Sequence, residues 1–363
     1  MIDSRGPTNT PADRSPRRWF QFSLRSLFVL TLLASLPLGW LSSEIRRASR
    51  QKKAVEAIVA CEATVWYSDG SSVAYGETIS TPPQVPWLTK LCGEDFLRRA
   101  IEVRYVPEHA ILPPTPRVRD TDLAALEDLP YLQSLDLLCA SQVTDAGLTH
   151  IGRLWQLRSL ALTDTRVGDE GLEHLKCLSR LEELFLSWTR ITDSGLARLS
   201  GLTRLRRLSV DGTQISDAGL RHLKRLIRLE RLGLGLTRIT DRGLEQLEGL
   251  TALQELEIED TAVTDRGLDH LKCLTTLRSL DLAGTLVSDH GLEKLKHLTA
   301  LRSLDVGGTL VTDAGLEHLK RFSQLEELDL NDTHVTPDGV TALRRALPNC
   351  KVSGCTATSV LLK

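Results

Sequence analysis

The chain has 363 residues, enough for a large core, and its charge is close to balanced, with 45 Lys+Arg against 47 Asp+Glu. This balance gives no reason to expect nucleic acid as a partner. Aromatic residues make up only 4% of the chain and leucine dominates the apolar residues, which is typical of a core made of stacked aliphatic layers.

The amino-terminal part contains a candidate membrane anchor. Residues 1–25 are polar and basic, which indicates a disordered leader, and residues 26–43 carry no charged side chain. As a helix this segment would span about 27 Å, close to the ~30 Å hydrocarbon thickness of a bilayer. We therefore predict a transmembrane helix over residues 26–43, with the lipid bilayer as one expected partner.

Two alternatives to the anchor stay open. One is a cleaved signal peptide, although the leader is long and no A-x-A site follows the apolar segment. The other is a buried soluble helix, although apolar side chains occupy all of its faces. Basic residues on both sides of the segment bring the positive-inside rule close to a tie. Because a short tail ahead of a single span usually stays inside, we expect a single-pass membrane protein with its repeats exported to the periplasmic or extracytoplasmic side.

Residues 44–118 are predicted to form a connector and a small α/β cap. Residues 44–56 are charged and helical in pattern, and alternating residues around Asp69-Gly70 indicate a hairpin. After a proline-containing loop at 81–86, residues 87–106 predict a helix followed by a short strand. Such a segment would cover the leucines of the first coil of a solenoid, which water would otherwise reach.

From residue 119 to residue 352 the sequence repeats with a period of 24, and residues 353–363 form a tail. A fixed period in this range indicates one small unit stacked on itself. The period is set by glycines at 147, 171, 195, 219, 243, 267, 291, 315 and 339.

Each unit predicts one strand and one helical return. Alternation at Leu184 and Leu186 indicates a short strand with its leucines inward, and a spacing of three from Leu172 to Leu181 indicates an α- or 3₁₀-helical segment. Successive strands then pair in parallel and their leucines form columns. The expected fold is an α/β solenoid, a horseshoe with a parallel β-sheet on its concave face.

Two polar positions and one glycine also recur along the units. The threonine after each strand, at 165 and every 24 residues to 333, is predicted to bond the backbone of the adjacent turn. The aspartate at 169 and every 24 residues to 313 is predicted to cap the helical segment. The glycine two residues later permits close approach of coils or an unusual φ. Histidines at 150, 174, 222, 270 and 318 are interpreted as solvated positions without metal.

The pattern L-x-x-L-x-L-x-x-T-x-[VI]-T-D-x-G-L-x-x-L-x-x-L resembles the leucine-rich repeats, specifically the cysteine-containing or F-box-associated subclass. The position after the strand is often Cys or Asn in that subclass, and it is Thr here. The leader, single span, cap and repeats together also look like membrane-anchored leucine-rich repeat proteins of bacteria, which are presumed to bind other proteins. The resemblance implies a non-catalytic scaffold for protein–protein interaction.

The outward-pointing strand residues are the candidate binding surface. We expect a protein or peptide partner with a basic segment over an acidic tract, and an apolar group near two exposed aromatic residues. The candidate partner-binding residues are Phe185, Trp188, Arg207, Arg231, Glu255, Glu257, Glu259, Asp281, Asp305, Glu327 and Asp329.

Two other function classes are weighed against this scaffold. The F-box resemblance would imply an adaptor that recruits substrates to a ubiquitin ligase, but no segment between 44 and 118 looks like an F-box bundle. An enzyme would have to use the cap at 54–118, with residues such as Glu94, Asp95 and Arg104. We find no catalytic, cofactor or metal motif. The seven cysteines leave only Cys61–Cys92 and Cys350–Cys355 as open disulfide pairings.

Overall fold

The fold is described from a computed structural model, which describes residues 24–68, 72–74, 77–79, 99–105 and 118–354. Side chains are described over these ranges except at 24–34, 36–38, 74 and 77–79. The chain divides into two compact units, residues 1–47 and residues 48–363.

The first described element is the helix α1 (Leu24–Ala60), which covers both the predicted anchor and the predicted helical connector. Among the described residues, no helix combines the length and the apolar character needed to cross a membrane. The structure therefore does not support the predicted transmembrane helix, and the anchor stays a prediction.

The cap forms the amino-terminal edge of the sheet. Its strands are β1 (Thr64–Tyr67), β2 (Ser72–Ala74), β3 (Glu77–Ile79) and β4 (Ala100–Arg104). β1 pairs antiparallel with both β2 and β4, which confirms the predicted hairpin, and β4 pairs in parallel with the first repeat strand. Apolar residues of α1 from Ala54 to Ile58 share one core with β1, β4 and the first coil. The predicted loop at 81–86 and the predicted helix at 87–98 lie outside the described residues.

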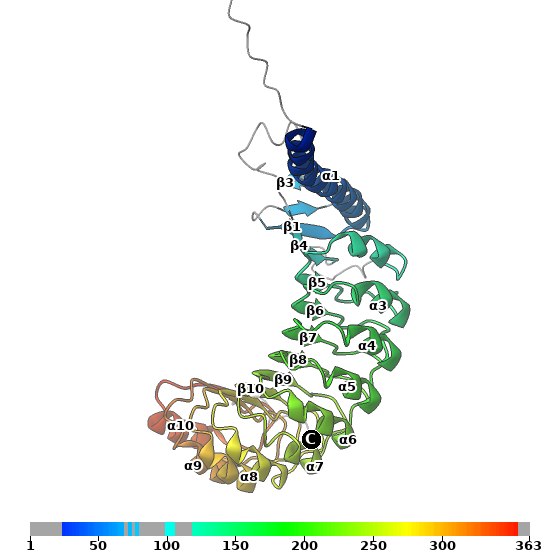
Figure 1. The fold of residues 1–363 in the computed structure, drawn as a ribbon. Coiled ribbons are helices and arrows are strands. Elements are labelled where there is room, and N and C mark those ends of the chain that lie inside the picture. The colour runs from blue at the N-terminus through cyan, green and yellow to red at the C-terminus, as the bar shows by residue number, and fades with distance from the viewer. Residues whose placement is uncertain (1–23, 69–71, 75–76, 80–98, 106–117, 355–363) are drawn as a thin grey trace, which may run out of the picture. The chain divides into compact units, whose positions relative to one another are not determined.

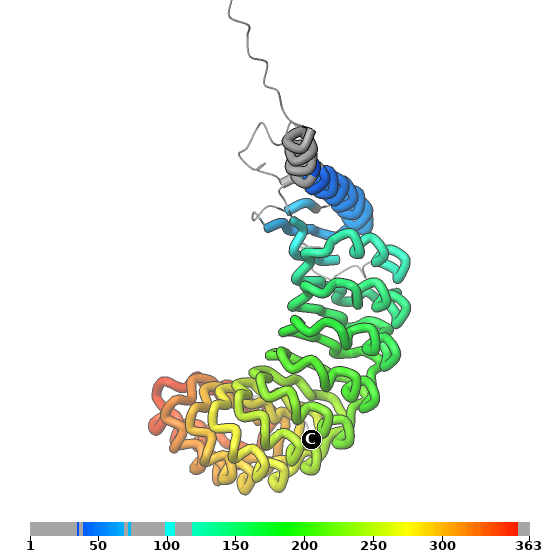
Figure 2. The backbone as a smooth tube through the Cα atoms, viewed as in Figure 1, coloured from blue at the N-terminus to red at the C-terminus, as the bar shows by residue number. Residues whose placement is uncertain are grey.

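Each repeat contributes one three-residue strand to a parallel sheet. Figure 1 shows the strands along one side of the coils and the helices along the other, and Figure 2 follows the successive coils of the backbone. The sheet runs in chain order from β4 to β14. The repeat strands are β5 (Ser134–Asp136), β6 (Ser159–Ala161), β7 (Glu183–Phe185), β8 (Arg207–Ser209), β9 (Arg231–Gly233), β10 (Glu255–Glu257), β11 (Ser279–Asp281), β12 (Ser303–Asp305), β13 (Glu327–Asp329) and β14 (Lys351–Ser353).

The return segments are short helices of both kinds, as the spacing of three predicts. They are η2 (Asp122–Asp128), α3 (Asp145–Ile151), α4 (Asp169–Leu175), α5 (Asp193–Leu199), α6 (Asp217–Leu220), η3 (Arg221–Arg225), α7 (Asp241–Glu245), η4 (Gly267–Cys273), α8 (Asp289–Lys294), η5 (Leu295–His297), α9 (Asp313–Leu319) and α10 (Pro337–Ala346). Leucines of strands and helices alike are fully buried in one continuous core that runs along the coils.

The recurring aspartate does not cap its own helix, which corrects the sequence-based prediction. The residue before it is the cap: the Thr240 hydroxyl accepts from the backbone N–H of Arg242, 3.3 Å away. The carboxylate of Asp217 instead accepts from the backbone N–H and the hydroxyl of Thr240 in the next coil, both at 2.7 Å. Each aspartate therefore joins its coil to the cap of the coil that follows.

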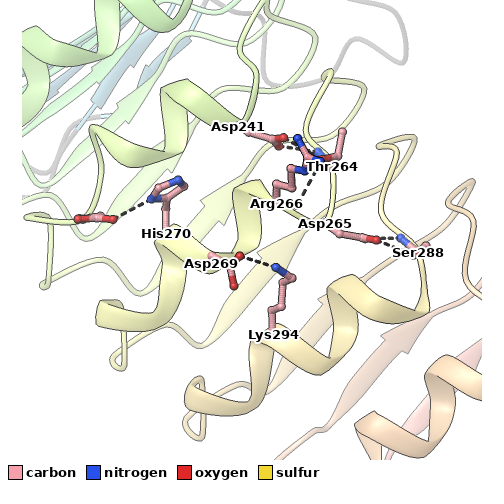
Figure 3. A network of polar contacts seen from close by, with 9 residues as sticks. Asp241, Thr264, Asp265, Arg266, Asp269, His270, Ser288 and Lys294 are labelled. Atoms are coloured by element: carbon pink, nitrogen blue, oxygen red, sulfur yellow. Dashed lines mark hydrogen bonds and ion pairs between the residues drawn. The ribbon is translucent and has the colours of Figure 1, made fainter.

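The same contact recurs through the array, and Figure 3 shows two successive examples, Asp241 with Thr264 and Asp265 with Ser288. It also explains the recurring glycine. A Cβ at Gly243 would lie 2.5 Å from Oδ1 of Asp217, so a side chain there would displace the carboxylate. The close approach predicted for these glycines is confirmed, and the bridge of aspartate, Ser/Thr cap and glycine is called the coil bridge below.

The recurring threonines have the predicted role. In each coil the buried hydroxyl donates to the carbonyl three residues earlier, for example from Thr165 to Leu162 at 2.7 Å and from Thr237 to Leu234 at 2.6 Å. The hydroxyl thus satisfies a carbonyl at the end of the strand and fixes the turn. Of the cysteines in the open disulfide pairings, Cys61 and Cys350 are free, whereas Cys92 and Cys355 lie outside the described residues.

The coil bridge predicts a coupled effect on stability. We expect Gly243→Ala and Asp217→Ala each to lower the free energy of unfolding by about 1–3 kcal/mol, through a steric clash and through lost hydrogen bonds respectively. The double variant should lose less than the sum, because removing the carboxylate of Asp217 removes the main clash. Urea unfolding measures all three values.

The control for this cycle is Gly249→Ala, since a Cβ at Gly249 meets nothing within 4 Å. Its stability should change by a few tenths of a kcal/mol at most. Strict additivity of Gly243→Ala and Asp217→Ala would contradict the coil bridge as the reason for the glycine.

Candidate interaction surface

The outward face of the repeat sheet is the candidate surface. Along β5–β7 and β10–β12 a buried leucine stands between two partly exposed residues, so the predicted inward and outward positions are confirmed. Parallel strands pair about 4.8 Å apart, whereas helices pack about 8–10 Å apart. The strand side of the solenoid is therefore its shorter, concave side.

Arg207 and Arg231, two of the predicted surface residues, each form an ion pair. Arg207 pairs with a carboxylate on the preceding strand, and Arg231 pairs with one on the following strand. The guanidinium of Arg207 lies 3.0 Å from Glu183, and that of Arg231 contacts Glu255. Near the carboxyl end, Nζ of Lys351 lies 3.7 Å from Glu327. Glu255 and Glu327 were predicted as members of an uninterrupted acidic tract. No Lys or Arg interrupts the tract on the outward face from β10 to β13, whereas Arg231 and Lys351 lie on the two strands that flank it.

Four carboxylates remain side by side at the middle of the face. Strand register pairs Glu257 with Asp281, Asp281 with Asp305, and Asp305 with Asp329. These four residues are called the carboxylate column. Like charges at directly paired positions repel each other, and burial raises the pKa of Glu257, Asp281 and Asp305, with nearby carboxylates adding to each shift. The column is an electrostatically unfavourable arrangement for the free protein.

The carboxyl-terminal end of the column opens into a groove. It is lined by polar side chains of β12, β13 and β14, namely Ser303, Asp305, Glu327, Asp329, Lys351 and Ser353. Within it Asp329 accepts from the backbone N–H of Asn331 at 2.7 Å and from the hydroxyl of Ser353 at 3.1 Å.

At the amino-terminal end of the column, two further carboxylates lie over the glycines of the β9 coil. The outward positions of the β9 coil include Gly233 and Gly235. A Cβ at Gly233 would lie 2.7 Å from Asp211, and one at Gly235 would lie 2.0 Å from Glu259. Asp211 is fully engaged, accepting from the hydroxyls of Ser187 and Ser209 and from the N–H of Gly235.

Glu259 is not engaged in this way. Its Oε2 is buried and has no hydrogen-bond partner among the described residues. Burial raises the pKa of Glu259 to about 7, and the charges of Asp281, Asp211 and Glu257 add to the shift. A positively charged group placed here would relieve both the unsatisfied oxygen and the repulsion.

The turn that follows each strand has a left-handed backbone conformation. One residue per coil has φ between 51° and 67°. Its N–H donates to a carbonyl of the next coil at each of these positions from Cys139 to Gly308. Glycine and aspartate suit this conformation, whereas a bulky residue is held there at a cost of about 1–2 kcal/mol. The positions are Cys139, Asp164, Trp188, Gly212, Leu236, Asp260, Gly284, Gly308 and Asp332.

Trp188 and Leu236 are the two bulky apolar residues among these nine, and both are exposed, at 56% and 43%. The indole of Trp188 leans over the intervening coil, since a Cβ at Gly212 would lie 2.7 Å from its ring carbons. Phe185 was predicted to be an exposed aromatic beside Trp188, but the structure places it half-buried on β7. Sequence reasoning missed Leu236, although its distance from Trp188 is two full periods.

Outside this face, few of the described residues suggest a catalytic or metal-binding site. Arg104 of the cap lies 2.8 Å from Glu102, and Glu94 and Asp95 lie outside the described residues. The hydroxyl of Tyr105 is buried and has no hydrogen-bond partner within the described part of the chain, and burial strongly raises its pKa. Within the described ranges no group of three or more His, Cys, Asp or Glu residues could hold a metal ion. On the helical side, His150 lies 2.6 Å from Glu127 and His270 lies 2.8 Å from Glu248.

Comparison with known proteins identifies the repeats. A family model described as "Leucine Rich repeat" matches residues 157–176, 273–296 and 324–343. The chain is a leucine-rich repeat protein. No curated protein matches it.

Among solved structures, this leucine-rich repeat protein is similar to an internalin from Listeria monocytogenes, with 23% identity over 65% of this chain and 71% of that chain and a TM-score of 0.54. Internalin C2 of the same organism is 28% identical over 59% of this chain and 84% of that chain, with a TM-score of 0.46. The likeness to the first internalin shows the fold. The cysteine-containing subclass stays a prediction.

The shifted pKa of Glu259 predicts a pH dependence of stability. Its folded-state pKa, about 7, lies above the ordinary value of 4.5, so the folded protein holds this proton more tightly than the unfolded chain does. The contribution of Glu259 to stability is therefore present below about pH 4.5 and should fall as pH rises to 7. Because Glu259 is partly exposed, we expect Glu259→Gln to remove no more than about 1 kcal/mol of that fall. Urea unfolding at a series of pH values measures it.

The matched control is Glu245→Gln on the exposed side of α7, which should leave the pH profile unchanged. A Glu259→Gln profile parallel to that of the wild type would show that Glu259 does not contribute.

Proposed function

We propose that this leucine-rich repeat protein is a membrane-anchored, non-catalytic scaffold that binds a polypeptide partner on the concave face of its sheet. The partner carries a basic segment that lies along the carboxylate column and an apolar group near Phe185 and Trp188. Leucine-rich repeat proteins are generally non-catalytic binding scaffolds, which supports the class of function.

The observation that carries the proposal is the uncompensated carboxylate column. Arg207, Arg231 and Lys351 lie at its two ends, and each is next to another carboxylate. Burial raises the pKa of Glu257, and the charge of Arg231 offsets part of that rise. Among the described residues, however, no cationic side chain forms an ion pair with the four carboxylates. A cation supplied by a partner would relieve their remaining repulsion. Complementary charge of this kind mainly sets association rate and partner choice.

The anchor and the side of the membrane belong to the same proposal. The uncharged segment at 26–43 supports one span. The short leader before it supports export of the repeats, since a short tail ahead of a single span usually stays inside. Anchoring would hold the concave face near the membrane surface, where its partner would also be found.

Charge reversal on the column tests the surface. The double variant Glu257→Lys and Asp281→Lys should bind a fluorescently labelled lysine-rich peptide at least about tenfold more weakly than the wild type, because attraction becomes repulsion. Fluorescence anisotropy measures the affinity, and the same double variant should fail to capture the wild-type partner from native membranes.

The matched control places the same charge change on the other side of the coils, with Glu293→Lys and Glu317→Lys on the exposed helical side. This control should bind as the wild type does. Unchanged binding by the column variant, or equal loss in both variants, would remove the concave face from consideration.

A charge inserted into the apolar segment tests the anchor. The double variant Leu32→Arg and Leu33→Arg should move from the membrane pellet to the supernatant in alkaline extraction, since an arginine in the bilayer centre costs about 2.5–3.5 kcal/mol. Leu32→Ile with Leu33→Ile should stay in the pellet. Reporter fusions before Ser26 and after Lys363 then give the topology, and recovery of the wild type in the supernatant would contradict the anchor.

A further inference from the structure

Trp188 and Leu236 are the two bulky apolar residues at the turns that follow the strands. Both are exposed apolar side chains at left-handed positions, where other coils have glycine or aspartate. Gly212 lies between them along the stack, and the indole occupies the space above its Cα. The two side chains stand at equivalent positions two coils apart, just after the ends of β7 and β9, on either side of the Gly212 coil. We call this part of the surface the apolar edge.

The occupant of the apolar edge follows from the charges around it. On the side of the following coils lie Glu259, whose Oε2 has no hydrogen-bond partner among the described residues, and the carboxylate column. Within the coils of the apolar edge itself, the two arginines at the starts of β8 and β9 are already paired, Arg207 with Glu183 and Arg231 with Glu255. An apolar group that reaches the edge therefore lies next to a negative surface, which selects a chain with positive charge on one side of that group.

The distances along the sheet set the spacing between the apolar residue and the basic residues of the peptide. From the coil of Gly212 to the start of the column at Glu257 is two strand steps, about 10 Å, and the column extends over three more steps, about 14 Å. An extended polypeptide advances about 3.3 Å per residue and presents alternate side chains to one face. Gly212 lies three residues beyond Ser209, the β8 counterpart of Glu257 in the register, so the path from the apolar edge to Glu257 is longer than two strand steps. Because the apolar and the basic side chains must point to the same face, an even number of residues separates them, and four residues, about 13 Å, cover this path. Three alternate residues cover the column.

We propose that the apolar edge is the subsite that recognises one large apolar side chain of an extended basic peptide, with three basic residues at alternate positions beginning about four residues away. This inference rests on the proposed function, since it takes the concave face as the binding surface. It adds the residues that contact the apolar group, with Leu236 among them. It also adds the spacing between the apolar and the basic parts of the peptide.

The test uses the full chain and two labelled decapeptides. Both carry three lysines at alternate positions, and four residues before the first lysine one peptide has leucine and the other serine. Wild type should bind the leucine peptide about tenfold more tightly than the serine peptide. In the double variant Trp188→Gly and Leu236→Gly the two peptides should bind equally, as measured by fluorescence anisotropy.

Two controls keep the result interpretable. Glycine has the same backbone conformation at Gly212, Gly284 and Gly308, so the double variant should fold, and thermal melting by circular dichroism checks this. Ile227→Ser removes an equally exposed apolar residue from the loop before β9 and should keep the wild-type preference for leucine.

The outcomes separate this inference from the proposed function. If both peptides bind wild type alike, or if the double glycine variant still prefers leucine, the apolar edge is not the subsite and the proposed function stands. If neither peptide binds wild type, both are wrong. A leucine preference that disappears only in the double glycine variant supports the inference.

Discussion

Contact between a leucine and its own counterpart in the next coil is the interaction on which the whole repeat region depends. Each coil is too small to bury its apolar side chains alone, and a strand of three residues cannot form a stable sheet by itself. Stacking at a constant period places each leucine against its copies, so that one core runs continuously through the coils. Any change in period within the strand or helix would misplace every apolar side chain after it.

The constant period also places each surface residue beside its counterpart. In the coil bridge this is favourable, because an aspartate always meets a hydroxyl and an N–H of the next coil. On the sheet face it is unfavourable, because the acidic position repeats over four coils and forms the carboxylate column. The repeat architecture thus gives this protein a stable scaffold and a strained, negatively charged face at the same time. A partner that relieves this strain would bind where the strain lies.

Sequence reasoning succeeded where a side chain's role depends on its own coil. Inward and outward strand positions, the threonine that bonds a carbonyl three residues earlier, and the antiparallel hairpin of the cap were all predictable. It was wrong for the recurring aspartate. A carboxylate at the start of a helix suggests a cap for that helix, yet the preceding Ser or Thr already provides the cap, and the next coil offers two donors within reach. The compensated charges of Glu255 and Glu327 were missed for a similar reason, since their cations belong to neighbouring coils.

By itself, the sequence determined the solenoid, the direction of its sheet and the set of residues that face outward, because period and alternation are properties of the chain along its length. Only the tertiary structure decided how those outward residues meet. The placement of Glu259 over Gly235, the lean of Trp188 across Gly212, and the left-handed backbone at Leu236 depend on the lengths of side chains and the hydrogen bonds between adjacent coils. Those contacts join residues a full period apart, and no local pattern encodes them.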